Sequence, residues 1–559
     1  MGIFRNSHQA IYFGGLLGLS FFYLVFGLTI LDTQNIGWLL QPNNQDSIQH
    51  FVGWEFFRHE AWGFPLGIIH NYGAPLATSI VYTDSIPILA ILFKCFSAWL
   101  PLHFQYFGFW YLICYFLQGI FAWLISEIIS DNLFLKIMIT CFFLLSPIML
   151  NRTLEHQALV AQWVLLAGFL LYLQPYHQHK LYYWFFLNVI TVLIHAYLAC
   201  MVLLIWVAFL FKNTWIECCL TKKSALFHIS ITVISLILTG WLAGYFIISL
   251  SQGITAGGYS LDSMNCLAPF IPGTGSPVLG GNWSRFFTQS FIFSIAQEDE
   301  GFNYFGLGML FLIVVSSVFF IGNFTRTRIV DIHTDWQPLL VMSAFLIIYS
   351  LSNVIMFGPI TLIHYSLPSL LMITDIFRAS GRFFWPVYYL TMISSFYFLS
   401  KIFNKTTLII VFSLALLLQW VDLSSKLQQL NQHFHQSYQF DELNSAFWQQ
   451  AAHHYKKIVF IPYTKYPQRQ IVHFQQYIHY AALHNMSVNL GYFARGEVSK
   501  AIEANRKILS KAVQEKLEAD TIYIILKPQM AAIFTNKSSA MDMKERIGNY
   551  VLIAPEVKF

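Results

Sequence analysis

Long apolar stretches separated by short polar turns run from the N-terminal region to Val421. A stretch of about 17–25 apolar residues is long enough to cross the hydrocarbon core of a membrane as a helix. We therefore predict an α-helical polytopic membrane protein with about eleven crossings. The predicted crossings are residues 10–31, 105–125, 133–150, 158–173, 181–194, 196–211, 229–250, 304–321, 339–357, 383–399 and 407–421.

The stretch Leu181–Phe211 decides the sidedness of the chain. It is uninterrupted, too long for one helix and too short for two full ones, and His195 lies at its middle. If it crosses twice, the lysines and arginines of the short loops fall on the same side as Arg5. Such an excess of positive charge is typical of the cytoplasmic side. Two short or broken segments are favoured, and an ionisable residue at the break is a functional candidate.

Residues Ser85–Leu100 resemble a crossing but contain Pro87 and Lys94 and would reverse this charge pattern. We interpret them as an interfacial or re-entrant helix. The first loop, residues 32–104, is then unusually long, which is typical of a functional loop. It lies on the face opposite the positive loops, called the outer face here, together with everything after Val421.

The polar region after the last predicted crossing has the pattern of a small α/β domain. Strands are predicted at Lys457–Ile461, Thr521–Leu526 and Tyr550–Ile553, and helices at Gln468–His484 and Lys500–Leu517. Alternating strands and helices favour a partly parallel sheet. We predict two domains, a membrane domain (residues 1–421) and an extramembrane α/β domain (residues 422–559). The α/β domain has no glycine-rich phosphate loop and no nucleophile elbow, so we expect it to bind or to scaffold.

Composition supports the membrane interpretation. The chain has 559 residues, 56% hydrophobic and 11% charged, whereas soluble domains carry about 25% charged residues. The net charge is +5, with no Lys/Arg-rich run or zinc-finger spacing, so no nucleic-acid partner is expected.

The first loop contains several candidate catalytic or metal-binding side chains. Asp46, Gln49, His50 and Gly53 share one face at helical spacing, and Asp84 lies in the same loop. A carboxylate there can accept a proton from a hydroxyl or bind a divalent cation such as Mg²⁺ or Mn²⁺. The alternative for Asp46 and Asp84 is that each caps a helix.

The second outer turn gathers Arg152, Glu155 and His156 between two crossings. A short turn does not need this many ionisable side chains, which indicates a function. Ordinary solvation of the turn is an equal alternative. The loop 251–303 ends in the acidic run Glu298-Asp299-Glu300, which fits either a lid or a plain connector.

Two arginines four residues apart, Arg378 and Arg382, precede the crossing 383–399 on the side expected to be poor in positive charge. Arginine is suited to bidentate capture of phosphate oxygens. The alternative is an anchor for lipid headgroups.

The layout resembles the GT-C superfamily of membrane glycosyltransferases: a long first outer loop with an early acidic residue, an interfacial helix, a second polar outer turn and a C-terminal outer domain. The runs 46–54, 82–87 and 377–383 also resemble an uncharacterised bacterial family of multi-pass membrane proteins. The resemblance implies transfer of a sugar from a polyprenyl-phosphate carrier to a glycan, lipid or protein acceptor. It implies the periplasmic face of a bacterial inner membrane, with the N-terminus cytoplasmic.

By this resemblance Asp46 is the catalytic base or the metal ligand, and Glu155 is the second acidic residue. Arg378 and Arg382 would hold the lipid phosphate. Substrate binding is expected of His50, Asp84, Arg152, His156, His195, Arg378 and Arg382.

Two other functions stay open. A transporter of lipid-linked sugars would favour charged residues inside the crossings and internal duplication; we see no repeat, and the polar residues gather at one face. A non-catalytic envelope-assembly protein would use its outer domain to recruit a partner.

Overall fold

The computed structural model describes residues 7–248, 259–273, 275–287, 299–323, 334–366, 372–464, 467, 471–537 and 542–556. The chain forms two compact units. One unit, called the membrane unit, comprises Met1–Thr33, Tyr106–Ile237 and Ala256–Gln436. The other comprises Gln34–Gln105, Leu238–Thr255 and Ser437–Phe559 and is called the outer unit after the location that the sequence predicts for it.

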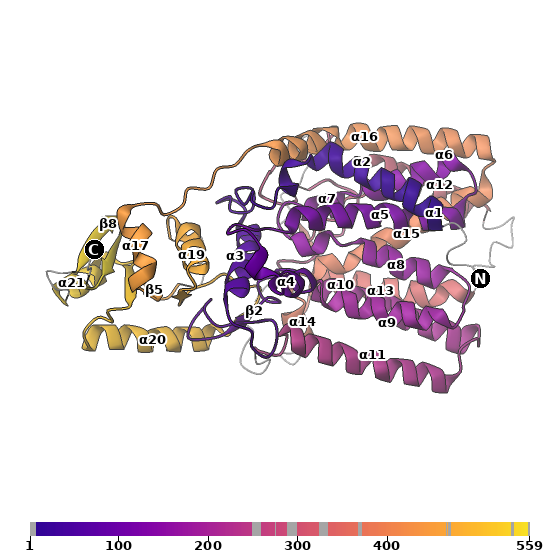
Figure 1. Cartoon of the computed structure of the whole chain (residues 1–559). Coiled ribbons are helices and arrows are strands. Elements are labelled where there is room, and N and C mark those ends of the chain that lie inside the picture. The colour runs from indigo at the N-terminus through magenta and orange to yellow at the C-terminus, as the bar shows by residue number, and fades with distance from the viewer. Residues whose placement is uncertain are drawn as a thin grey trace. The chain divides into compact units, whose positions relative to one another are not determined.

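The membrane unit is helical throughout most of its described length (Figure 1). Five of the described helical segments are long and apolar enough to cross a membrane: Phe107–Ile129, Leu133–Arg152, Ala196–Ile216, Lys222–Ala243 and Lys405–His435. Shorter apolar helices cover Ala10–Phe26, Gln157–Leu173, Leu307–Gly322 and Gln337–Leu351. These segments are those expected of a multi-pass membrane protein.

The remaining helices of this unit complete the bundle. The helices of this unit, including those within the segments above, are α1 (Ser7–Gln9), η1 (Ala10–Gly14), α2 (Gly15–Phe26), η2 (Thr29–Leu31), α5 (Phe107–Ile129), α6 (Leu133–Leu144), α7 (Pro147–Arg152), η4 (Gln157–Val160), α8 (Trp163–Leu173), α9 (His179–Val192), α10 (Ala196–Phe211), η5 (Lys212–Ile216), α11 (Lys222–Ala243), α12 (Leu307–Asn323), η7 (Thr334–Trp336), α13 (Gln337–Leu351), α14 (Met372–Ile376), η8 (Ser380–Phe384), α15 (Trp385–Ile402) and α16 (Lys405–His435).

Close packing of α2 on α5 depends on glycine. A Cβ at Gly18 would lie 2.2 Å from the carbonyl oxygen of Tyr115, and one at Gly119 would lie 2.1 Å from the carbonyl oxygen of Gly14. Gly14 and Gly18 form a GxxxG pattern, which lets two helix backbones approach without side chains between them.

The predicted break at His195 is confirmed. Leu181–Phe211 forms two helices, α9 and α10, and His195 between them has extended backbone with φ −166° and ψ 138°. Its Nδ1 accepts the backbone N–H of Tyr197 at 3.1 Å, so the imidazole caps α10. The expected short helix within Ser85–Leu100 is confirmed as α4 (Pro87–Lys94), which is too short to span a membrane.

One predicted boundary is wrong. The segment 339–357 is not one helix, because α13 ends at Leu351 and a hairpin follows, β3 (Val354–Phe357) with β4 (Ile360–His364). The helix of the last predicted crossing, α16, continues past Val421 as one helix of 31 residues.

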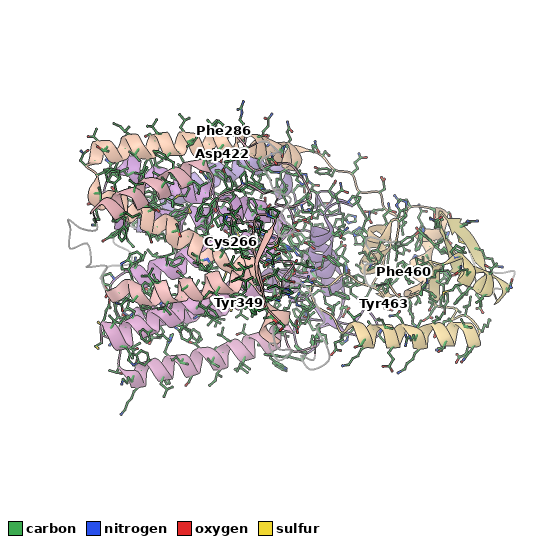
Figure 2. All side chains as sticks on the ribbon, turned by 180° about the vertical axis from the view of Figure 1, so that it is seen from behind. Cys266, Phe286, Tyr349, Asp422, Phe460 and Tyr463 are labelled. Carbon is green, nitrogen blue, oxygen red and sulfur yellow. The ribbon has the colours of Figure 1, made fainter. Side chains whose placement is uncertain are left out.

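Asp422 does not end α16 because its carboxylate is satisfied inside the bundle. Asp422 is labelled in Figure 2. It accepts hydrogen bonds from Tyr304 Oη at 2.8 Å, from the Leu307 N–H at 2.9 Å, and from Ser284 Oγ. A polar residue is tolerated within an apolar helix when buried partners satisfy it.

The outer unit is built around a mixed sheet of five strands in the order β6-β5-β7-β9-β8. The strands are β5 (Lys457–Ile461), β6 (Ser487–Val488), β7 (Thr521–Ile525), β8 (Met543–Ile547) and β9 (Tyr550–Ala554). β5 pairs in parallel with β6 and β7, whereas β9 is antiparallel to β7 and β8. The predicted strands and the partly parallel sheet are confirmed.

Helices α17 (Ala446–His454), α19 (Phe474–Leu483), α20 (Val498–Gln514) and α21 (Pro528–Lys537) accompany the sheet (Figure 1). The predicted helix 500–517 corresponds to α20. The predicted helix 468–484 corresponds to α19, and its residues 468–470 lie outside the described residues.

The first outer loop belongs to the same unit as this sheet. It contains α3 (Gln45–His59), α4 and the short pair β1 (Ile68–Ile69) with β2 (Thr78–Ser79). Tyr72 forms a parallel bridge with Val488, whose carbonyl accepts the N–H groups of Gly73 and Ala74 at 2.9 and 2.8 Å. Backbone hydrogen bonds therefore add the first loop to the β6 edge of the C-terminal sheet.

Candidate functional site

Helix α3 carries the first group of predicted site residues. Its start is capped by Asn44, whose Oδ1 accepts the N–H of Ser47 at 3.2 Å. The alternative that Asp46 caps the helix is therefore wrong. Asp46 lies inside the first turn, where the helix dipole favours a negative charge.

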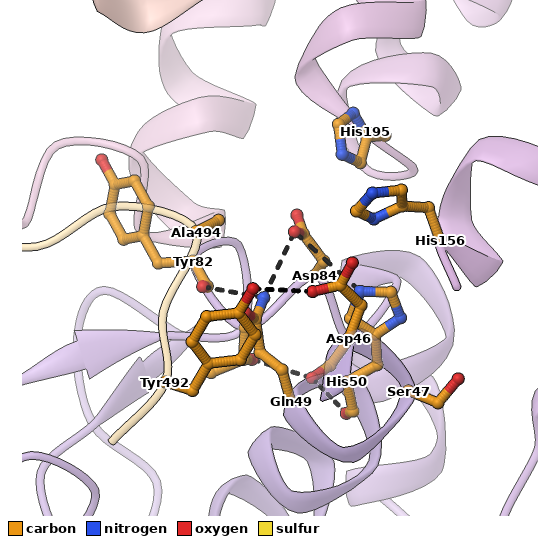
Figure 3. A network of polar contacts seen from close by, with 12 residues as sticks. Asp46, Ser47, Gln49, His50, Tyr82, Asp84, His156, His195, Tyr492 and Ala494 are labelled. Atoms are coloured by element: carbon orange, nitrogen blue, oxygen red, sulfur yellow. Dashed lines mark hydrogen bonds and ion pairs between the residues drawn. The ribbon is translucent and has the colours of Figure 1, made fainter. Parts of the chain in front are cut away.

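Asp46 is held by a residue from the far end of the chain. Tyr492 Oη donates to Asp46 Oδ1 at 2.8 Å (Figure 3). Tyr492 follows β6, and its backbone N–H donates to Tyr72 Oη at 3.2 Å. The contact between the first loop and the C-terminal region thus fixes a side chain against the predicted catalytic carboxylate.

Asp84 approaches the next turn of α3. Its Oδ2 accepts from Gln49 Nε2 at 3.3 Å and lies 4.0 Å from His50 Nε2 (Figure 3). Gln49 and His50 follow Asp46 by three and four residues, so both aspartates flank one face of the helix. The structure brings together Asp46, His50 and Asp84, as the helical spacing predicts for the first two.

The backbone around Asp84 is strained. Asp84 has φ +53° and Ile86 has φ +52°. The left-handed region is uncommon for any non-glycine residue and an outlier for a β-branched one. Such strain is concentrated at functional sites, where the surrounding structure maintains it. Here Ser85 Oγ donates to the His50 carbonyl at 2.7 Å and ties this turn to α3.

This arrangement, called the aspartate site, suits proton transfer. Two carboxylates lie beside an imidazole and an amide, and the nearby hydroxyl of Tyr492 stabilises the charge of Asp46. Carboxylate oxygens are also the ligands that Mg²⁺ and Mn²⁺ prefer, and Mg²⁺ commonly takes one or two carboxylates.

A second polar cluster, called the arginine cluster, lies in the membrane unit. Glu300 Oε2 accepts from Arg382 Nε at 2.7 Å and pairs with Arg152 Nη1 at 2.9 Å. Glu300 Oε1 contacts Arg382 Nη2 and lies 3.1 Å from His156 Nε2. Arg152 also donates to the Asp299 carbonyl at 3.2 Å.

The arginine cluster places two guanidinium groups around one carboxylate. Arg152 and Arg382 are buried, and both pair with Glu300. Burial raises the pKa of Glu300, but Arg382, Arg152 and His156 together lower that pKa well below its usual value. Glu300 therefore stays ionised.

His156 has two incompatible partners. Its Nε2 lies 2.9 Å from Arg382 Nη2 and 3.1 Å from Glu300 Oε1. An unprotonated nitrogen accepts from Arg382, whereas a protonated one donates to Glu300, and it cannot do both. The contact that this nitrogen makes depends on the tautomer of the ring.

Aromatic rings support both arginines. The Arg382 guanidinium lies 4.8 Å from the ring centroid of Tyr197, and that of Arg152 lies 5.6 Å from Trp385. These contacts fix the orientation of the guanidinium planes.

The other predicted residues have these surroundings. Arg378 is 38% exposed, and its Nε lies 3.7 Å from Asp262 Oδ2. Glu155 is buried, and His195 caps α10. The structure thus joins Arg152, His156 and Arg382 through Glu300 and pairs Arg378 with Asp262.

Sequence reasoning missed two residues of these sites. Glu300 belongs to an acidic run that the sequence displays, but its pairing with Arg152 and Arg382 has no local signal. Tyr492 follows a two-residue strand and has no pattern that links it to Asp46.

Comparison with known proteins gives a family without an activity. Among curated proteins, none matches the chain. Residues 447–555 match the family model described as the DUF6311 C-terminal domain. Residues 15–424 match the domain of unknown function DUF6311, so the chain belongs to this family.

Proposed function

We propose that the protein is a membrane glycosyltransferase of GT-C-like architecture, which moves a sugar from a polyprenyl-phosphate carrier to a cell-envelope acceptor. The observation that carries the proposal is the aspartate site, in which Asp46 is held by Tyr492 on the helix face that also meets Asp84. A preorganised carboxylate in a long loop of a membrane protein suits activation of an acceptor hydroxyl.

In the proposed reaction Asp46 takes the proton of the acceptor hydroxyl. The acceptor oxygen forms a bond to the anomeric carbon of the sugar while the bond from that carbon to the carrier phosphate breaks. The carrier leaves as polyprenyl phosphate, or as the diphosphate if the carrier is a diphosphate. Asp84 and Gln49 would position the sugar hydroxyls, and His50 would support the charge of Asp84.

The arginine cluster supports a role for a phosphate. Its two guanidinium groups, Arg152 and Arg382, are buried, where a charge interaction is stronger than in water. Because Arg382 is already bound by Glu300, we assign the mobile contact with the carrier phosphate to Arg378, which is more exposed.

A divalent cation, Mg²⁺ or Mn²⁺, would bind to Asp46 and Asp84. Such an ion would neutralise negative charge that develops on the leaving group. Loss of activity with a chelator, restored by Mg²⁺ or Mn²⁺, is the expected behaviour.

We place the two outer clusters on the periplasmic face of a bacterial inner membrane, with about eleven crossings and a cytoplasmic N-terminus. The Lys/Arg distribution supports this sidedness. A cysteine-accessibility map that puts residues 46 and 500 on opposite faces would overturn it.

The test of the function is Asp46→Asn in the native host. The amide keeps the size of the side chain and can still accept from Tyr492, but it is not a base. We expect the envelope glycan to lose one modification by mass spectrometry, with protein level and membrane insertion unchanged. Asp131→Asn, in an exposed turn of the membrane unit, is the matched control and should leave the glycan intact.

An unchanged glycan in Asp46→Asn would reject the catalytic assignment and leave an assembly role. Accumulation of the lipid-linked sugar on the cytoplasmic side would instead indicate a transporter. Binding of polyprenyl phosphate to the protein in nanodiscs tests the role of Arg378. We expect Arg378→Ala to weaken this binding about tenfold. Arg285 is exposed, and Arg285→Ala is the control that should leave the binding unchanged. Equal binding by both variants would make Arg378 a headgroup anchor.

A further inference from the structure

A cluster of imidazoles and carboxylates lies in the outer unit, apart from the residues assigned above. It contains Glu55 of α3, His479 of α19 and His103 of the loop before α5. One potential ligand atom from each of these three lies within 4.8 Å of those of the other two.

Glu442 adds a fourth group. Its Oε1 lies 3.2 Å from His103 Nε2 and 3.9 Å from His479 Nε2. The segment that carries it is anchored by Phe440, whose ring meets that of His479 edge-on at 5.1 Å.

Two atoms of the cluster are buried without a hydrogen-bond partner. Glu55 is fully buried and His479 is 1% exposed, yet neither Glu55 Oε1 nor His479 Nε2 makes a hydrogen bond. A buried imidazole nitrogen without a partner, such as His479 Nε2, is costly and calls for an explanation such as an ion.

The other atoms of these two side chains are firmly placed. Glu55 Oε2 accepts from His479 Nδ1 at 2.6 Å. A carboxylate behind an imidazole fixes the orientation of the ring and directs the opposite nitrogen outward, as in the carboxylate–histidine–metal arrangement. His479 Nε2 is thereby turned toward His103 and Glu442.

The loop that carries His103 is held in place by α3. Arg58 donates to the carbonyls of Leu102 and Pro101 at 3.0 Å, and Trp54 Nε1 donates to the carbonyl of Phe104 at 2.9 Å. The backbone on both sides of His103 is thus preorganised.

We propose that His103, His479 and Glu442 bind one divalent transition-metal ion of the Zn²⁺ class, which joins the first loop to the C-terminal domain, while Glu55 orients His479 from its Nδ1 side. Imidazole nitrogen with carboxylate oxygen is a common zinc donor set, whereas Mg²⁺ and Ca²⁺ prefer oxygen alone. His103 and Glu442 are 26% and 38% exposed and provide the path by which an ion enters.

The geometry requires a small contraction. Tetrahedral ligand atoms about 2.0 Å from Zn²⁺ lie about 3.3 Å from one another. Rotation of the His103 and Glu442 side chains, the exposed pair, can close the remaining gap. Without the metal a proton serves the same purpose: burial lowers the pKa of His479, but Glu55 and Glu442 outweigh burial and raise that pKa to about 9.

The test uses the full-length protein in nanodiscs. After chelation and reloading with Zn²⁺ we expect one Zn²⁺ per chain by mass spectrometry of the metal, and a higher melting temperature than with Mg²⁺. Loading with Co²⁺ should give the visible absorption of a tetrahedral ion with nitrogen and oxygen donors.

The variants His103→Ala and Glu442→Gln change the exposed side of the site and should not disturb folding. We expect each to weaken Zn²⁺ binding at least tenfold. His453→Ala, an exposed histidine of α17, should bind as the unchanged protein does.

Failure of the folded protein to bind Zn²⁺ or to shift its melting temperature would overturn the proposal and leave a proton-bridged ion pair. Equal binding in His103→Ala and the unchanged protein would also overturn it. X-ray absorption at the zinc edge of the unchanged protein gives a test independent of the variants, because a sulfur donor there would exclude this donor set. The site does not depend on glycosyl transfer.

Discussion

The Tyr492 hydroxyl donates to the Asp46 carboxylate at 2.8 Å, although the two residues are 446 positions apart. The bond joins the first loop to the C-terminal domain and makes the domain a contributor to the aspartate site. The expectation that this domain binds or scaffolds stays a prediction, but it now includes a contact to the proposed base.

Tyr492→Phe removes this bond and keeps the ring. A hydrogen bond to a charged group contributes about 1.5–3 kcal/mol, so we expect glycosyl transfer to fall about tenfold or more with little change in melting temperature. The measurement is the turnover of a lipid-linked sugar by membranes that contain each variant. Tyr463 lies in the same unit and is labelled in Figure 2, so Tyr463→Phe is the control. An equal loss of turnover in the two variants would show that Tyr492 has no specific role.

Glu300→Gln should change how the membrane unit responds to acid. The pKa of Glu300 is lowered in the folded protein, so its stabilising contribution is complete above the unfolded value of about 4.3 and is lost as the pH falls below that value. We expect the melting temperature of the unchanged protein in detergent to fall below about pH 4.3. The variant should melt lower at pH 7 and show a smaller further loss in acid.

The comparison of the two pH profiles decides whether Glu300 is the group concerned. Parallel profiles for Glu300→Gln and the unchanged protein would assign the acid response to other carboxylates.

Gly18→Ala tests the contact of α2 with α5. The new Cβ would lie 2.2 Å from the Tyr115 carbonyl oxygen, so the two helices must separate. We expect destabilisation of about 1–3 kcal/mol, measured by thermal unfolding in detergent. Gly322→Ala in α12 meets nothing within 4 Å and should be neutral; similar losses in both would mean that close packing is not the cause.

Asp422→Ala removes the acceptor for Ser284, Tyr304 and the Leu307 N–H. Buried donors left without an acceptor cost about 1–3 kcal/mol each, so we expect a marked fall in melting temperature and in yield of folded protein. Asp441→Ala, at an exposed position, is the control. A stable Asp422→Ala protein would show that water or a neighbour replaces the carboxylate.

The sequence predicts most elements because their signals are local. Apolar length identifies the membrane helices, and the short apolar runs Lys457–Ile461 and Thr521–Ile525 become buried strands. Pro87 marks the start of α4. Strand β8 has the polar sequence Met-Lys-Glu-Arg-Ile and was not predicted. It lies at the edge of the sheet, where a strand can face solvent on both sides, so its sequence shows no alternation of apolar and polar residues.

The surroundings of Asp422 could not be predicted from local sequence. It is a polar residue at the end of an apolar run, but its carboxylate is buried and bonded to partners from two other segments, Ser284 and the pair Tyr304 and Leu307. The hydrogen-bond partners of a buried residue in the folded chain cannot be predicted from the residues next to it in the sequence.

The sequence by itself determines that the chain is a multi-pass helical membrane protein with a partly parallel C-terminal sheet, and it selects Asp46, His50, Arg152 and Arg382 as candidates. Tertiary structure alone decides their partners: Tyr492 on Asp46, Glu300 between Arg152 and Arg382, and His479 on Glu55. The physical reason is that hydrophobic periodicity is a property of neighbouring residues. Pairing of buried polar groups instead depends on which distant segments the fold brings within hydrogen-bond distance.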